Sequence, residues 1–128
     1  MGQHHQRNSE WGSFRNAFRG IFYNVKTQKH FRIHLFVTIV VLLTAYWLGL
    51  ERWEWAILFL TISSVLTAEA INTAVEITVD LAEPNVHPLA GLAKDVAAGA
   101  VLIAVIMAVG VGILLFGPPL AKLLGLLL

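Results

Sequence analysis

Residues 68–80 read AEAINTAVEITVD, and this stretch decides how the rest of the chain is interpreted. Its strongly polar residues recur at helical spacing: Glu69, Asn72, Glu76 and Asp80. At about 100° per residue these four positions share about 80° of arc, and they span about 16 Å along the helix axis. Three carboxylates and an amide on one face of a mostly apolar helix are costly in hydrocarbon. We therefore expect them to face a bundle interior or an aqueous site, and to mark a function.

The composition around this stretch is that of a membrane protein. Hydrophobic residues make up 57% of the 128 residues and charged residues only 13%, whereas soluble domains carry about 25% charged residues. The mean hydropathy is +0.71. No cysteine is present, which excludes disulfide, thiolate and iron–sulfur chemistry. The composition predicts an all-α integral membrane protein with a single domain over residues 1–128.

Three apolar runs predict three membrane-spanning helices, over residues 33–50, 53–80 and 94–117. The first run has no Lys, Arg, Asp or Glu between Arg32 and Glu51. Gly117, Pro118 and Pro119 are expected to stop the third helix. The remaining tail, residues 118–128, is apolar but too short to span a bilayer by itself.

Residues 11–32 are predicted to form an amphipathic helix on the bilayer surface. Apolar residues recur there at helical spacing, at Trp11, Phe14, Phe18, Ile21, Phe22 and Val25. Basic residues oppose them, at Arg15, Arg19 and Lys26, a pattern typical of surface helices. The alternative is a simple basic flank to the first span.

The basic residues also orient the chain. Six of the nine precede the first span: Arg7, Arg15, Arg19, Lys26, Lys29 and Arg32. The positive-inside rule then places the N-terminus in the cytoplasm. The row of Glu69, Asn72, Glu76 and Asp80 on the second span, called the acidic stripe below, then descends to the cytoplasmic surface, where ATP is available.

The third span carries small residues every fourth position, at Ala100, Ala104, Ala108 and Gly112. Such a stripe allows helices to approach closely. Part of it is expected to serve packing within the chain. Because three helices alone enclose three acids poorly, we also expect a homo-oligomer.

The chemistry that these residues permit is phosphoryl transfer or ion conduction. No GxxxxGK[ST] motif is present, but Lys94 and Asp95 begin the third span close to the end of the acidic stripe. Lysine can meet phosphate as a point charge, and carboxylates can hold magnesium that bridges phosphates. Acidic chains in membranes also serve as proton relays, so a proton- or ion-conducting protein remains the alternative. No nucleic-acid partner is expected.

The motif AEAINTAVEITVDL, followed by HPLAGLAKDVAAGAVLIA, resembles the signature of the small prokaryotic membrane lipid kinases, the diacylglycerol kinase and undecaprenol kinase family. Phe14, Ala17, Phe18 and Gly20 match the upstream family pattern, and residues 31–34 match FRIH. The resemblance covers about residues 12–117.

The resemblance implies a homotrimeric bundle in a bacterial inner membrane, with one surface helix and three spans per subunit. It also implies transfer of the ATP γ-phosphoryl group to a membrane lipid hydroxyl, with Mg²⁺, at sites shared between subunits and open to the cytoplasm. By position, Glu69 would be the general base, Asn72 would orient the reacting groups and Glu76 would hold metal and nucleotide. Lys94, Asp95 and His87 would serve the nucleotide, for which Arg15 and Arg19 are further candidates; anionic lipid is the alternative partner of both arginines.

One position departs from the family pattern. The family usually has a metal-binding Glu three residues before the Phe of FRIH, where this chain has Gln28. Gln28 is therefore expected to be a weak metal ligand, and Asp80 is a possible further one. A catalytically weak homologue is the alternative to a working kinase. The segments HPLA, AAGAVL, NTA and RIH resemble the undecaprenol kinase branch of the family, so undecaprenol is the expected lipid. The alternative is diacylglycerol, which would be phosphorylated to phosphatidic acid.

Overall fold

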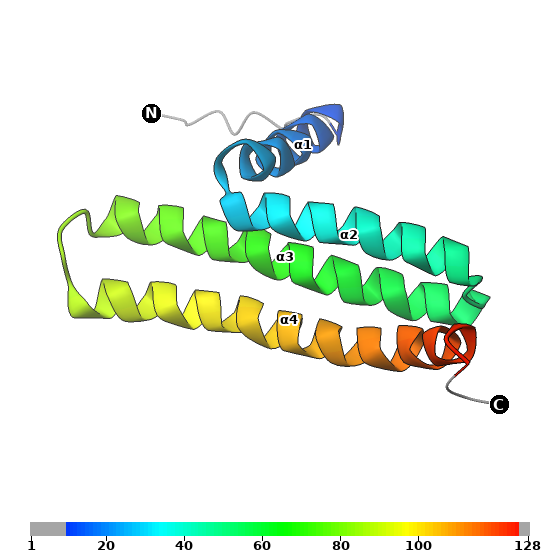
Figure 1. Cartoon of the computed structure of the whole chain (residues 1–128). Coiled ribbons are helices and arrows are strands. Elements are labelled where there is room, and N and C mark those ends of the chain that lie inside the picture. Colours follow the sequence, from blue (N-terminus) through cyan, green and yellow to red (C-terminus); the bar gives the residue numbers. More distant parts are fainter. Residues whose placement is uncertain (1–9, 126–128) are drawn as a thin grey trace.

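The computed structural model describes residues 10–125, which form four helices: α1 (Glu10–Thr27), α2 (Lys29–Leu48), α3 (Arg52–Ala82) and α4 (Pro88–Leu123). No strand occurs within this range. The helices α2, α3 and α4 lie side by side, whereas α1 lies outside them near the start of α2 (Figure 1). Each of the three is long and apolar enough to cross a membrane, which confirms the all-α membrane fold predicted from the sequence. Arg7 and the last three residues of the expected tail fall outside the described range.

The first helix ends earlier than the sequence predicts. The surface helix was expected to reach residue 32, but α1 ends at Thr27 and α2 begins at Lys29. Gln28 alone separates them, in an extended conformation with φ −97° and ψ 113°. The prediction is wrong here because a hydropathy run marks the part of a helix in hydrocarbon, and the polar first turn of α2 lies before that run.

The turn between α2 and α3 is closed by local backbone bonds. Gly49 ends α2 with φ 68°, a left-handed conformation that glycine adopts without steric cost. Glu51 and Glu54 then form a capping box, in which the Glu51 N–H donates to Glu54 Oε2 at 2.7 Å. A buried apolar cluster lies beside this turn, consisting of Ala45, Leu50, Leu58 and Leu115. Within residues 10–125, the buried apolar cluster of the bundle therefore lies at this end.

The last helix is longer than predicted at both ends. The limits expected from the sequence were 94 and 117, but α4 runs from Pro88 to Leu123. It begins early because Pro88 suits the first helical position and His87 caps it, with Nδ1 accepting from the Leu89 N–H at 3.2 Å. Pro118 and Pro119 do not stop it. Proline removes a helix hydrogen bond and bends the axis, and Figure 1 shows the final part of α4 turned away from the rest.

Part of the small-residue stripe of α4 faces the inside of the chain. Ala108 and Gly112 line a pocket together with residues of α2 and α3. Small side chains here allow α4 to pack closely within one chain. The role of the stripe in a homo-oligomer remains a prediction.

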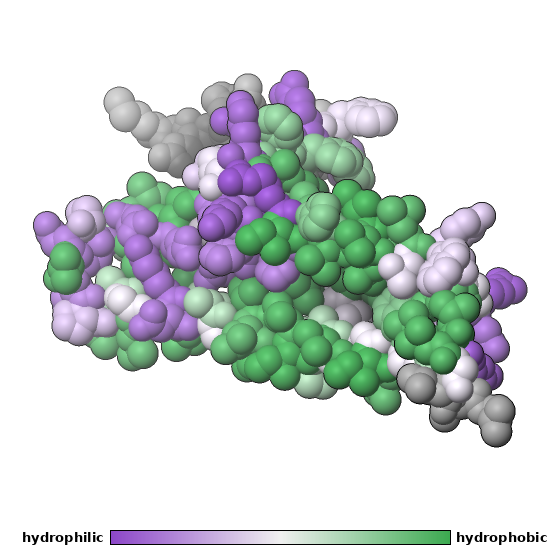
Figure 2. All heavy atoms as spheres, in the orientation of Figure 1, coloured by the Kyte–Doolittle hydropathy of each residue, from purple (hydrophilic) through white to green (hydrophobic). Residues whose placement is uncertain are grey.

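The helices α3 and α4 extend beyond the start of α2. With 20 residues α2 is about 30 Å long, whereas α3 has 31 residues and is about 46 Å long. Phe31 of α2 lines the same groove as Ala70 of α3, so the first turn of α2 lies level with the start of the acidic stripe. The stripe therefore occupies the part of α3 that α2 does not cover (Figure 1). Hydrophilic side chains gather at this end, and apolar ones cover most of the remaining bundle (Figure 2).

Candidate active site

Glu69 is the most deeply placed of the predicted site residues. It is 5% exposed, on the face of α3 that also buries Val65 and Thr73. The Thr73 hydroxyl donates to the Glu69 backbone carbonyl at 3.1 Å, not to its carboxylate. Within residues 10–125 the Glu69 carboxylate has no hydrogen-bond or ion-pair partner. The carboxylate oxygens are not among the fully buried unpartnered atoms of this range, so an external donor can reach them.

Asn72 and Glu76 form a pair one turn further along the same face. Asn72 Nδ2 donates to Glu76 Oε1 at 3.0 Å, and both side chains are half-buried. The other amide atom, Asn72 Oδ1, is buried and has no partner among the described residues. An unsatisfied buried acceptor beside a carboxylate is the arrangement that a cation or a hydrogen-bond donor would complete.

Asp80 and Lys94 join the ends of α3 and α4. The Lys94 ammonium forms an ion pair with the Asp80 carboxylate. The two residues line a polar pocket of about 280 Å³ that Glu83, Asn85 and His87 also line. From the sequence, Lys94 was expected near the acidic stripe because the third span begins shortly after the second ends. The structure shows that the two are in contact.

The remaining predicted site residues are spread over the surface of the single chain. Arg15 and Arg19 are exposed on α1, and Asp95 is exposed near the start of α4. None of them lines the polar pocket. His87 lines it, and its Nδ1 serves as the cap of α4.

The metal ligands expected from the sequence are not gathered into one cluster in the single chain. Within the described part of the chain, no group of three His, Asp or Glu side chains is suited to hold a metal ion. Gln28 lies at the corner between α1 and α2, where its Nε2 donates to Thr27 Oγ1 at 3.2 Å. A metal site made by Glu76, Gln28 and Asp80 stays a prediction.

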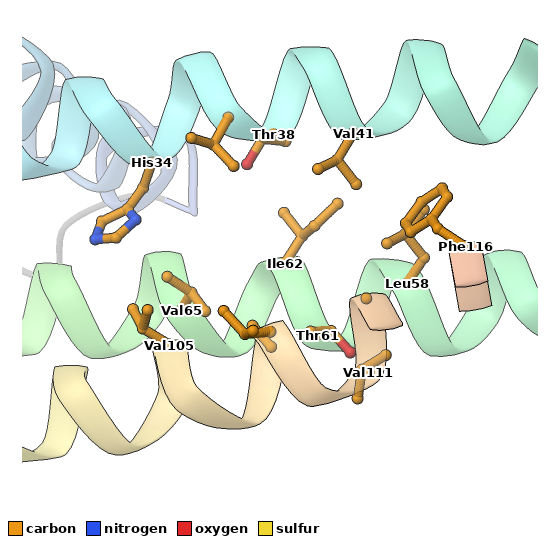
Figure 3. A pocket seen from close by; sticks show the side chains of 14 residues that line it. His34, Thr38, Val41, Leu58, Thr61, Ile62, Val65, Val105, Val111 and Phe116 are labelled. Carbon is orange, nitrogen blue, oxygen red and sulfur yellow. The ribbon is translucent and has the colours of Figure 1, made fainter. Parts of the chain in front are cut away.

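An apolar pocket lies one helical turn from Glu69, on the side toward the opposite end of the bundle. It has a volume of about 260 Å³ and lies between α2, α3 and α4, with His34 at one end and Phe116 at the other (Figure 3). Val65, which lines it, is one helical turn from Glu69 on the same face of α3. Apart from His34, its polar lining consists of Thr38 and Thr61.

Sequence reasoning did not find this pocket. Its walls come from three helices, and no local pattern marks which apolar residues face each other. The motif FRIH contains His34, but the motif itself gives no sign that the side chain lies between helices.

Comparisons with known proteins give the family of this chain. The family described as prokaryotic diacylglycerol kinase matches residues 15–116. The chain is 41% identical over 108 residues to an undecaprenol kinase of Bacillus subtilis, covering 84% of this chain and 88% of that protein. It is 48% identical over 113 residues to a diacylglycerol kinase of Synechocystis sp., covering 88% of this chain and 65% of that protein.

A third relative is more distant. A diacylglycerol kinase of Escherichia coli (strain K12) is 34% identical over 79 residues, which is 62% of this chain and 65% of that protein. The family match includes most of α1, all of α2 and α3, most of α4 and every predicted site residue. This multi-pass membrane protein therefore belongs to the prokaryotic diacylglycerol kinase family, and it is a lipid kinase.

Proposed function

We propose that this lipid kinase transfers the γ-phosphoryl group of ATP to the hydroxyl of undecaprenol, at the face of α3 that carries Glu69, Asn72 and Glu76. The observation that carries the proposal is Glu69, a largely buried residue whose carboxylate is unpaired within residues 10–125, one turn from the Asn72–Glu76 pair. The acidic stripe begins where α2 begins, and α2 is about long enough to cross the hydrocarbon core. A lipid hydroxyl lies at this boundary of the bilayer, and ATP approaches it from water.

In this proposal Glu69 is the general base. Its carboxylate has a free acceptor site within residues 10–125 and can take the proton of the lipid hydroxyl. Asn72 holds the Glu76 carboxylate through its Nδ2 and leaves Oδ1 to orient the reacting groups. Positioning and charge stabilisation are the main tasks of a protein in phosphoryl transfer.

The donors present fit Mg²⁺. The unpartnered Asn72 Oδ1 and the Glu76 carboxylate are oxygen donors, which this hard cation prefers. When bound, Mg²⁺ would neutralise phosphate charge. Gln28 and Asp80 are the further candidates, the first as a weak ligand because it carries no charge.

Lys94, Asp95 and His87 are proposed to bind the nucleotide, with Arg15 and Arg19 of α1. Lys94 lines the polar pocket at the end of α3 and α4, where an ammonium group can meet phosphate. Its ion pair with Asp80 is partly exposed, so water and ligand can compete for it at little cost.

We also propose that the active unit is a homotrimer with its sites facing the cytoplasm. One chain leaves Asp95, Arg15 and Arg19 on its exposed surface. A second chain beside it would enclose the site from the open side. The basic residues that precede the first span favour a cytoplasmic N-terminus.

Two observations bear on the lipid. The similarity to the undecaprenol kinase of Bacillus subtilis extends over 88% of that protein, and an apolar pocket of about 260 Å³, one helical turn from Glu69, offers room for part of a hydrocarbon tail. Diacylglycerol is the second candidate, because the diacylglycerol kinase of Synechocystis sp. is 48% identical.

The test is a kinase assay on the purified protein in bilayers, with labelled ATP and Mg²⁺ and with undecaprenol, diacylglycerol or ceramide as the acceptor. We expect the highest kcat/KM with undecaprenol. If kcat/KM is higher with diacylglycerol, diacylglycerol is the substrate in place of undecaprenol. If none of the acceptors is phosphorylated, the proposal is contradicted.

A further inference from the structure

We propose that Arg32 is a positioning residue, which holds α1 across the bilayer surface and thereby keeps Arg15, Arg19 and Gln28 in place for catalysis. The catalytic consequence rests on the proposed function. The contact itself is a feature of the corner between α1 and α2.

The carbonyl groups at the end of α1 need donors from outside the helix. The last four carbonyls of a helix have no intrahelical partner, and together they carry a partial negative charge. Gln28 N–H satisfies the carbonyl of Asn24 at 2.8 Å. The carbonyls of Val25 and Lys26 would require the N–H groups of Lys29 and His30. No such bond forms within residues 10–125, because the extended Gln28 turns the chain away from the axis of α1.

Arg32 supplies the missing donors. Its Nη1 donates to the carbonyl of Val25 at 3.3 Å and to that of Lys26 at 3.1 Å. The guanidinium also brings a positive charge to the negative end of the α1 dipole. These are the only side-chain hydrogen bonds that join α1 to α2 within residues 10–125.

Packing also contributes to the corner, where Asn24 and Phe31 are buried, but no other side-chain hydrogen bond joins α1 to α2 within residues 10–125. One extended residue, Gln28, connects the two helices, and its side chain bonds only to Thr27 among the described residues. The backbone of Arg32 belongs to the first turn of α2, where its N–H donates to the Gln28 carbonyl at 3.3 Å. The side chain therefore ties the end of α1 to a rigid membrane-spanning helix. Without it, α1 can pivot about Gln28, and its basic residues lose their fixed distance to the acidic stripe.

The contact is tested by spin-label distance measurements between α1 and α2. The chain has no cysteine, so Asn16→Cys and Leu43→Cys give one labelled site on each helix, and dilution with unlabelled chain isolates the distance within one chain. Arg32→Met removes the donors and keeps much of the stem, whereas Arg32→Lys keeps a charged donor. Lys29→Met is the matched control, because it removes the same charge from the same turn and Lys29 has no side-chain partner among the described residues.

We expect a broader distance distribution in Arg32→Met, a smaller change in Arg32→Lys and no change in Lys29→Met. The KM for ATP should rise several-fold in Arg32→Met, while kcat falls less, and Arg32→Lys should recover part of the loss. Coincident distance distributions for Arg32→Met and the unmodified protein overturn the proposal, as does an unchanged KM for ATP despite a broadened distribution. If Arg32→Met fails to fold, the comparison of Arg32→Lys with Lys29→Met decides. Absence of kinase activity in the unmodified protein contradicts the proposed function, and the distances still decide whether Arg32 holds the corner.

Discussion

Glu69 combines burial with a carboxylate that has no partner within residues 10–125. Hydrogen bonds and opposite charges normally compensate a buried carboxylate, and ionisable residues in membrane helices are rare without a function. The nearby Thr73 hydroxyl is already used by the backbone. A packing role alone gives no reason for a charge at this position, whereas proton transfer from a lipid hydroxyl does.

The first prediction concerns this carboxylate. Glu69→Gln should lower kcat by about 100-fold or more, the contribution typical of a general base. The glutamine keeps the size of the side chain, so the helical content and the oligomeric state should not change. Glu54→Gln, at the far end of α3, is the control, because glutamine also completes a capping box. A kcat for Glu69→Gln close to that of the unmodified protein removes Glu69 from the role of base.

The second prediction concerns Gln28. Gln28→Glu should lower the Mg²⁺ concentration that gives half-maximal activity, because Mg²⁺ prefers anionic oxygen ligands. His30→Glu adds the same charge two residues away and serves as the control. If the Mg²⁺ dependence of Gln28→Glu equals that of the unmodified protein, Gln28 is a structural residue of the corner, and another carboxylate such as Asp80 completes the site.

At the scale of helices, the difference in length between α2 and α3 defines the site. The part of α3 beside α2 is packed and apolar, and the part beyond α2 carries the acidic stripe. One helix thus carries an apolar part and a polar part, and Glu69 lies where the two meet. The apolar pocket extends from the same face of α3 into the bundle.

The third prediction tests whether this pocket receives the lipid tail. Ala108→Leu adds bulk to the lining of the pocket and should raise the KM for undecaprenol, with little effect on the KM for ATP. Met107→Leu is the control, because the neighbouring side chain is exposed on the outer face of α4. An unchanged KM for the lipid in Ala108→Leu places the tail outside the pocket.

Over the whole molecule, polar side chains lie where water is expected, and apolar side chains lie where lipid is expected. Apolar side chains of α2, α3 and α4 are exposed over most of the bundle, as expected where lipid replaces water. Hydrophilic side chains gather toward the end that carries the loop between α3 and α4 (Figure 2). This asymmetry suits an enzyme that takes one substrate from the bilayer and the other from water.

The fourth prediction separates a kinase from an ion conductor. ATP should raise the thermal unfolding temperature of the protein only when Mg²⁺ is present, because a ligand that binds the native state stabilises it by mass action. ADP with Mg²⁺ should give a smaller shift. A proton leak in liposomes that contain the protein, combined with no shift from ATP and Mg²⁺, favours ion conduction.

The sequence by itself determined the helical spans, the acidic stripe and the chemistry that the stripe permits. Each of these follows from local periodicity and from the cost of polar groups in hydrocarbon, which depend only on neighbours in the chain. Glu69, Asn72 and Glu76 share a face of α3 for this reason, and Asn72 and Glu76 are bonded as their spacing allows.

Only the tertiary structure decided what depends on contacts between distant residues. The ion pair of Lys94 with Asp80, the inward direction of Ala108 and the contact of Arg32 with the end of α1 join separate helices or cross a corner. The sequence patterns also did not predict that α1 ends at Thr27 or that α4 continues past Pro118. Hydropathy indicates which part of a helix lies in the hydrocarbon of the bilayer. Capping bonds and packing against neighbouring helices decide where the helix itself begins and ends.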